Sequence, residues 1–292
     1  MTILVTGATG RVGRQVVQQL VQRDAKVRVL VRDPAKADFP AGVEVAKGDL
    51  LDIDALRSAF KGMRTLFLLN AVAGDEFTQA LVALNIARES GVDRVVYLSV
   101  IHADRFVNVP HFAVKSGAER MIHEMGFSAT ILRPAYFIDN ELRIKDVILN
   151  HGVYPMPIGG KGVAMVDIQD IAEVAALELI RRDQAQDKLP VETINLVGSE
   201  ILTGASAAAI WSDVLGRPVV YAGDDSTGFE QNLSAFLPRW MAYEMRLMAE
   251  RYVTDGMLPE AGDVERLTRI LGRSLRSYRD FVTEVASDAA ST

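Results

Sequence analysis

ILVTGATGRVG, residues 3–13, is the stretch of this sequence that determines the fold. It places Gly7, Gly10 and Gly13 between a run of β-branched residues and an amphipathic helical pattern. The residues before the first glycine predict a buried strand, and the segment that follows repeats its apolar residues at helical spacing. The apolar face of that helix consists of Val12, Val16, Val17, Leu20 and Val21. The chain therefore passes from a strand to a helix through a glycine turn.

A glycine turn between a strand and a helix indicates dinucleotide binding. The turn needs unusual backbone angles, the diphosphate must approach bare main chain, and the helix must pack against the sheet. The exposed amides of the helix then hold the phosphates. The spacing is GxxGxxG rather than the GxGxxG of most nicotinamide dehydrogenases. We expect the nucleotide to contact the whole turn, namely Gly7, Ala8, Thr9, Gly10, Arg11, Val12 and Gly13.

The composition is ordinary for a soluble globular protein. The 292 residues are 49% hydrophobic and 24% charged, with a net charge of -6. Phosphate contact needs clustered cations, so direct nucleic-acid binding is not expected. No apolar stretch approaches the roughly 18 residues that span a bilayer, and the first residues already form a strand. We therefore expect a cytoplasmic protein. Because the sequence has no cysteine and no HExxH spacing, we expect no bound metal.

Strand and helix patterns alternate through the first half of the chain. Strands are predicted at residues 3–6, 26–31, 43–46, 65–70, 94–100 and 129–133. Continuous apolar strands suit a parallel sheet buried on both faces, and the right-handed crossover rule then makes this sheet doubly wound. The pattern predicts an α/β protein with a Rossmann fold.

The regular alternation ends at YPMPIGGKG, residues 154–162, which is rich in proline and glycine. We expect residues 1–153 to form the nucleotide-binding domain, with residues 163–199 partly returning to its sheet. Residues 154–162 and 200–292 are expected to form a smaller, mainly helical substrate or lid domain.

The residue that ends the second strand indicates which nucleotide binds. An acid there binds the adenosine ribose, whereas an arginine accommodates a 2′-phosphate. Arg32 occupies this place, Lys36 follows one turn later, and Arg11 adds a third cation. Asp33 is the contrary evidence, because it could serve the ribose if the strand ends one residue later. The pattern favours NADP(H) over NAD(H).

Two polar residues follow later strands. Asp49, after the third strand, is a candidate contact to adenine. Asn70 ends the fourth strand, where the ribose and the diphosphate should pass. Either residue could instead be a turn former.

Four motifs resemble the NmrA-like family of atypical short-chain dehydrogenase/reductases. They are TGATGRVG, VRDPAK, HFAVKSGAERMIHEMGFSATILRPAYFIDN and VDIQDIA, and the final GRSLRSYRDFV resembles the C-terminal helix of the family. The resemblance implies a Rossmann domain that binds NADP(H) and a small α-rich domain over the nicotinamide. Family members include quinone and dye reductases, plant phenylpropanoid reductases and non-catalytic redox sensors.

The resemblance also implies candidate catalytic residues. Ser99 and Lys115 match the serine and lysine of standard short-chain reductases, while His111 stands at the position of their tyrosine. His111 and Lys115 share a helical face, so Lys115 could hold the nicotinamide ribose and its ammonium would disfavour a positive charge on His111. A neutral His111 could donate a proton to a carbonyl oxygen. Ser99 as a turn residue and His111 as an ordinary polar residue near a helix start are the alternatives. Tyr136, just after the sixth strand, could line the nicotinamide or only pack.

Two functions remain open from the sequence. One is an NADPH-dependent oxidoreductase that delivers hydride to a small quinone-, enone- or dye-like electrophile. The other is a non-catalytic NADP(H)-binding redox sensor that acts through a protein partner. The absence of the YxxxK tyrosine favours the sensor, and the retained lysine favours the reductase. A sugar-nucleotide epimerase is less expected, because it normally needs the tyrosine.

Overall fold

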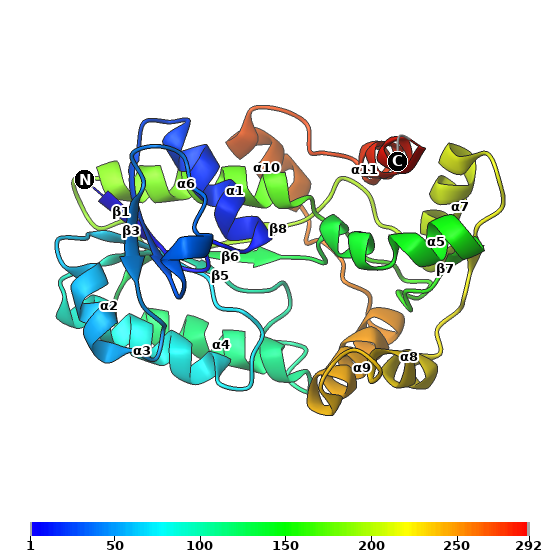
Figure 1. The fold of residues 1–292 in the computed structure, drawn as a ribbon, viewed down its shortest axis with the longest axis horizontal. Coiled ribbons are helices and arrows are strands. Elements are labelled where there is room, and N and C mark those ends of the chain that lie inside the picture. The colour runs from blue at the N-terminus through cyan, green and yellow to red at the C-terminus, as the bar shows by residue number, and fades with distance from the viewer. Residues whose placement is uncertain (1, 291–292) are drawn as a thin grey trace. The chain divides into compact units, whose positions relative to one another are not determined.

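A seven-stranded sheet dominates the computed structural model, which describes residues 2–290 apart from the side chains of Lys36 and Ala290 (Figure 1). The strand order is β3-β2-β1-β4-β5-β6-β8, and the strands from β1 to β6 pair in parallel. The order reverses at β1 and β4, which defines a doubly wound sheet. The predicted α/β Rossmann fold is confirmed.

The sheet consists of β1 (Thr2–Val5), β2 (Lys26–Val31), β3 (Glu44–Lys47), β4 (Thr65–Leu68), β5 (Arg94–Leu98), β6 (Ser128–Pro134) and β8 (Glu192–Leu196). One face is covered by α1 (Arg11–Val21) and α6 (Ile168–Gln184), and the other by α2 (Ile53–Phe60), α3 (Glu76–Glu89) and α4 (Pro110–Glu124) (Figure 1). Strands β4 and β5 each end two residues earlier than predicted. Asn70 and Ser99 therefore lie beyond their strands, past the carboxyl edge of the sheet.

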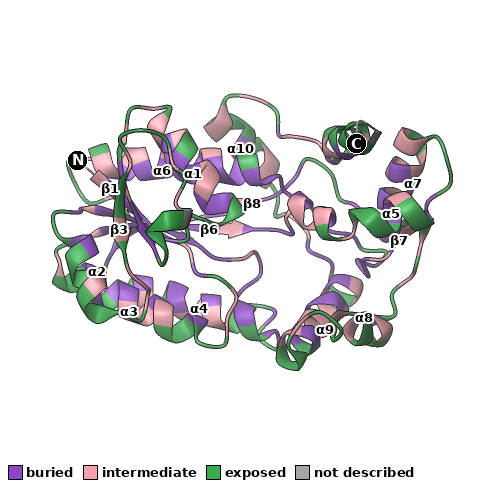
Figure 2. Cartoon of the chain, in the orientation of Figure 1, coloured by how far each residue is buried: buried purple, intermediate pink, exposed green. Residues whose placement is uncertain are grey.

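Alternating strand residues face the two helical layers. Leu4, Leu30 and Leu66 belong to one apolar core with Phe60 of α2 and Leu84 of α3. Figure 2 shows the sheet buried between helices whose outer faces are exposed. Full burial of a leucine or phenylalanine side chain contributes roughly 1.5–3 kcal/mol, so this core stabilises the edge of the sheet from which the candidate site residues project.

The chain divides into two compact units. The first contains Met1–Ala103, His111–Arg133 and Ile168–Ile194, and the second contains Asp104–Pro110, Pro134–Asp167 and Asn195–Thr292. Within the described residues, no helix of either unit is both long and apolar enough to cross a membrane.

The second unit is mainly helical but also contains a short parallel sheet that the sequence pattern did not indicate. Its strands are β7 (Val153–Tyr154) and β9 (Val220–Tyr221). The helical elements outside the large sheet are η2 (Ile138–Arg143), α5 (Lys145–His151), α7 (Gly204–Leu215), α8 (Ser226–Leu233), α9 (Arg239–Thr254), α10 (Asp263–Leu271), α11 (Tyr278–Ala290) and the short η1 (Pro34–Lys36), which follows β2 in the first unit.

A carboxylate is buried inside the second unit. Glu141 of η2 has 0% exposure and accepts hydrogen bonds from the hydroxyls of Tyr154 and Tyr278, each at 3.0 Å. Tyr136 bonds to the same carboxyl group, and the indole N–H of Trp211 donates to the Tyr278 hydroxyl at 2.9 Å. Loss of hydration raises the pKa of Glu141 from 4.5 to about 7, although the tyrosine hydrogen bonds oppose this rise. The unit thus holds a carboxyl group that titrates near neutrality.

The raised pKa of Glu141 predicts that the protein loses stability as the pH rises. Folded Glu141 binds its proton more tightly than unfolded Glu141, so its contribution is complete below pH 4.5 and is lost as the pH passes about 7. The size of the effect is on the order of 3 kcal/mol. We expect Glu141→Gln, which stays neutral, to gain several degrees in Tm relative to the wild type over this range. Thermal unfolding at a series of pH values measures this, and a Tm difference that is independent of pH would contradict it.

Candidate functional site

The glycine turn brings the end of β1 against the start of α1. Gly7 has φ +63°, in the left-handed region that favours glycine. A Cβ atom on Gly13 would lie 2.2 Å from the carbonyl oxygen of Gly7 and 2.8 Å from the Cα of Ala8. Both contacts are with backbone, which cannot rotate away. Residue 13 must therefore be glycine for the helix to begin this close to the strand.

Helix α1 begins without a side-chain cap. Gly10 is the N-cap residue, its N–H donates to the Gly7 carbonyl at 3.0 Å, and its own carbonyl accepts from the N–H of Arg14 at 2.9 Å. The amides of the first turn have no partner within a helix, and they carry the positive end of its dipole. Gly7, Thr9 and Gly10 are exposed, so an anion can approach this end of the helix over main chain alone.

The Thr6 side chain forms hydrogen bonds that join the glycine turn to the end of β4. The sequence pattern did not indicate this role. The Thr6 hydroxyl lies within hydrogen-bonding distance of the carbonyls of Phe67, at 3.2 Å, and Leu69, at 3.1 Å, and accepts the N–H of Leu69 at 2.9 Å. A polar residue at the end of an apolar strand was the available signal. This contact fixes the chain just before Asn70.

Asn70 is buried without a hydrogen-bond partner. It is 3% exposed, and neither its side-chain oxygen nor its nitrogen is bonded to any of the described residues. A buried polar group left unsatisfied costs about 1–3 kcal/mol, so such groups call for an explanation. A polar ligand group that reaches this edge of the sheet would satisfy the amide. The bare glycine turn and this unpartnered amide both fit a bound dinucleotide.

The residues predicted for the adenosine end follow β2 and β3. Arg32 is the first residue after β2 and is exposed. The carboxylate of Asp33 accepts the N–H of Ala35 at 3.1 Å and so caps η1, which weakens the contrary reading in which Asp33 serves the ribose. Asp49 accepts the N–H of Leu51 at 3.0 Å, so it is at least a turn former. The side chain of Lys36 lies outside the described residues.

Lys115 lies on α4 and is held by an acid that the sequence pattern did not indicate. Its ammonium is 2.9 Å from the carboxylate of Glu76 and 3.4 Å from the carbonyl of Leu98, and it lies over the Tyr97 ring. These two bonds use two of its three N–H donors. Because Glu76 compensates the ammonium, Lys115 does not present an unbalanced positive charge on this face of α4. His111 is buried on the same face of α4.

Ser99 is also held by an acid that the sequence did not point to. Its hydroxyl donates to Oε1 of Glu119, which lies one helical turn beyond Lys115 on α4. The guanidinium of Arg133 donates two hydrogen bonds to the same carboxylate, with Nε 2.9 Å from Oε1 and Nη2 2.5 Å from Oε2. An acid four residues after Lys115, on the buried face of the helix, was the only local signal. The first unit therefore brings Ser99, Lys115 and Asn70 to the ends of β4 and β5.

Tyr136 belongs to the second unit. Its ring meets that of Tyr252 edge-on at 6.2 Å, and its hydroxyl is bonded to Glu141. Burial raises the pKa of Tyr136 well above its usual value, so the hydroxyl keeps its proton. Its place beside the nicotinamide stays a prediction.

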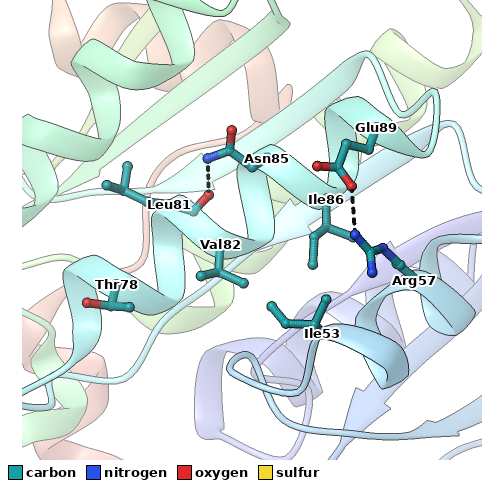
Figure 3. A pocket seen from close by; sticks show the side chains of 8 residues that line it. All are labelled: Ile53, Arg57, Thr78, Leu81, Val82, Asn85, Ile86 and Glu89. Atoms are coloured by element: carbon teal, nitrogen blue, oxygen red, sulfur yellow. Dashed lines mark hydrogen bonds and ion pairs between the residues drawn. The ribbon is translucent and has the colours of Figure 1, made fainter.

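A groove of about 320 Å³ lies between α2 and α3 in the first unit (Figure 3). Its apolar lining includes Ile53 and Val82, and Arg57 and Glu89 form an ion pair at 3.4 Å at one end. Both charged side chains are more than half exposed, so this pair adds little stability. None of the predicted site residues lines this groove, so it is separate from the candidate nucleotide site.

Comparisons with known proteins show what the chain is similar to. The model of the NmrA-like family matches residues 1–275. The chain is 29% identical to an NAD(P)H azoreductase of Xenophilus azovorans, over 96% of each chain. It is 31% identical to a (4-alkanoyl-5-oxo-2,5-dihydrofuran-3-yl)methyl phosphate reductase of Streptomyces griseus, over 97% of this chain and 98% of the other. The crystal structure of an NADPH-dependent quinone oxidoreductase of Escherichia coli complexed with NADPH superposes with a TM-score of 0.85 at 26% identity, over 97% of this chain and 99% of the other.

The geometry of the turn predicts unequal effects of adding a methyl group at its glycines. Gly13→Ala should destabilise the protein by about 1–3 kcal/mol, because the new Cβ meets immobile backbone. Gly10→Ala is the matched control, since its Cβ would lie 3.3 Å from the Gly7 carbonyl oxygen, and it should cost less than about 1 kcal/mol. Urea unfolding of the two variants measures the difference. Equal losses would show that the approach of α1 to β1 is not the constraint.

Proposed function

The chain belongs to the NmrA-like family, and from this membership and its site geometry we propose that it is an NADP(H)-dependent oxidoreductase that delivers hydride to a small quinone-, enone- or dye-like electrophile. The observation that carries the proposal is the bare turn from β1 to α1, where backbone occupies the place of any side chain on Gly13. Such a turn is suited to a diphosphate that must touch main chain. The unpartnered amide of Asn70 supports the same ligand.

Each part of the cofactor has residues to hold it. The amides of the turn bind the diphosphate, Arg32 and Lys36 bind the 2′-phosphate, Asp49 lies toward the adenine, and Asn70 satisfies a ribose or diphosphate oxygen. When bound, the reduced nicotinamide supplies the hydride. The residues proposed to contact the cofactor are Gly7, Ala8, Thr9, Gly10, Arg11, Val12, Gly13, Arg32, Lys36, Asp49, Asn70, Lys115 and Tyr136.

Three side chains of the first unit are the candidates for the chemistry. Lys115 keeps one N–H donor beyond its bonds to Glu76 and Leu98, and this donor holds a ribose hydroxyl. His111, on the same helical face, is the candidate proton donor to the reduced substrate, a contribution of about 10²- to 10⁴-fold. The Ser99 hydroxyl donates its hydrogen bond to Glu119, so it is not the proton donor to the substrate. Much of the rate then comes from positioning hydride donor and acceptor together.

The substrate class is supported by the relatives. Their names describe reduction of an azo compound, a quinone and an oxo-dihydrofuran, which share a conjugated π system that accepts a hydride. All three are reductases, so turnover of a small molecule is better supported than the nucleotide sensor that the sequence also allows.

Turnover is the direct test of this function. The purified protein, mixed with NADPH and a panel of quinones, enones and azo or triphenylmethane dyes, should consume NADPH faster than the protein-free blank with at least one acceptor. Absorbance of NADPH follows the reaction. Lys115→Met should lower the rate, because it removes the donor to the ribose. No turnover across the whole panel by protein that binds NADPH would contradict the proposal.

Cofactor preference tests Arg32. Arg32→Ala should weaken NADP(H) binding about 10- to 100-fold, the loss expected for hydrogen bonds to a charged phosphate, and should leave NAD(H) binding nearly unchanged. Lys26→Ala is the matched control, since Lys26 is an exposed cation at the opposite end of β2. Isothermal titration gives both constants. An equal loss for the two nucleotides would remove Arg32 from the 2′-phosphate site.

A further inference from the structure

The side chains around Ser99 determine which hydrogen bonds its hydroxyl can make. The hydroxyl donates within the protein and is left to accept from another group. Ser99 is buried one residue beyond β5, and its N–H donates to the carbonyl of Leu132 at 2.8 Å, which fixes its backbone. Its hydroxyl donates a hydrogen bond to Glu119. A serine hydroxyl has one proton and two lone pairs, so only the lone pairs remain for another group.

Glu119 cannot donate a hydrogen bond to the Ser99 hydroxyl. Arg133 donates from two nitrogens to the two oxygens of its carboxylate, at 2.9 Å and 2.5 Å. A guanidinium stays protonated in proteins. A bidentate ion pair with it requires an ionised carboxylate, which only accepts hydrogen bonds. Ser99 must therefore donate to Glu119. The pair makes the serine a hydrogen-bond acceptor toward any ligand.

A second set of the same residue types shows what a purely structural arrangement looks like. The hydroxyl of Thr130 donates to Glu178 at 2.6 Å, but Nε of Arg182 donates back to that hydroxyl at 2.6 Å. The Thr130 hydroxyl thus has both a donor and an acceptor within the chain. Among the described residues, none donates to the hydroxyl of Ser99, so its accepting capacity is unused.

We propose that Ser99 is a specificity-determining residue that accepts a hydrogen bond from an N–H group of the ligand, the carboxamide of the nicotinamide. The inference rests on the proposed function. In a sheet of this strand order the second mononucleotide lies across the ends of β4, β5 and β6, and Ser99 follows β5. Ribose hydroxyls can donate or accept, whereas the carboxamide nitrogen of that half only donates. An accepting serine could take a hydrogen bond from either group, but only the carboxamide nitrogen is restricted to donating, and the proposed site already gives a ribose hydroxyl a partner in Lys115.

Paired ligands test the assignment. NADP⁺ is compared with its 3-acetylpyridine analogue, in which an acetyl group replaces the carboxamide and removes its N–H donors. Isothermal titration gives the ratio of the two dissociation constants without turnover. We expect the wild type to favour NADP⁺, and Ser99→Ala to reduce this preference about 2- to 10-fold by weakening NADP⁺ alone. Ser99→Thr keeps the hydroxyl and should retain the preference.

Two further variants separate the role of Ser99 from a general loss of packing. Glu119→Leu combined with Arg133→Met removes the hydrogen-bond acceptor together with its cation. The Ser99 hydroxyl can then donate to a ligand, so the preference for NADP⁺ over the 3-acetylpyridine analogue should become smaller. Thr130→Val removes the other carboxylate-bonded hydroxyl and should leave the ratio unchanged.

The possible outcomes distinguish this assignment from the proposed function. A wild type that binds neither nucleotide overturns both. Binding of both nucleotides with the same ratio in Ser99→Ala as in the wild type overturns only the assignment of Ser99. The assignment of Ser99 also fails if Thr130→Val changes the ratio as much as Ser99→Ala does. A ratio that falls in Ser99→Ala and stays high in Ser99→Thr supports the assignment.

Discussion

The contact between Gly13 and the carbonyl of Gly7 is the constraint on which the nucleotide site depends. Because no side chain fits there, α1 begins directly at the end of β1, and its first amides lie at the carboxyl edge of the sheet. Thr6 joins the same point to the end of β4 and so fixes the backbone that precedes Asn70. A helix that began farther from its strand would leave the phosphates to side chains, which are longer and less ordered than main chain. The rest of the site is arranged around this point.

Features that depend on near neighbours in the chain were predictable from the sequence. The glycine turn and the buried face of α1 follow from spacing within about twenty residues, and the structure has both. Asp52 caps α2 by accepting the N–H of Ala55, as an acid before an apolar helical pattern predicts. Strand ends were less accurate, because Leu69 and Val100 are apolar like the strand residues before them although the pairing has already ended. Leu69 and Val100 are only half-buried, so an apolar residue after a strand does not show that the strand pairing continues.

Features that depend on distant parts of the chain were not predictable. Glu76 and Lys115 are thirty-nine positions apart and meet because α3 and α4 lie against the same face of the sheet. A glutamate in the first turn of a helix has an ordinary explanation, the helix dipole, and so gives no hint of a buried partner. The strands β7 and β9 are two residues each, too short for any alternation to be visible. Each of these features depends on contacts between residues that are far apart in the chain, and a single sequence does not show which distant residues meet.

The two buried acids change what a short-chain reductase motif means in this chain. Glu76 balances the charge of Lys115, and Glu119, whose own charge is balanced by Arg133, accepts the hydrogen bond of the Ser99 hydroxyl. The lysine and the serine are therefore fixed in position and in hydrogen-bond direction, and neither is left as a mobile acid. A balanced site also spares the protein an uncompensated buried charge, which would cost several kcal/mol per ion. Lys115 and Glu119, the two titratable groups that share this face of α4 with His111, are each held in an ion pair, so the charges that the helix presents at the ends of β4 and β5 are balanced within the first unit.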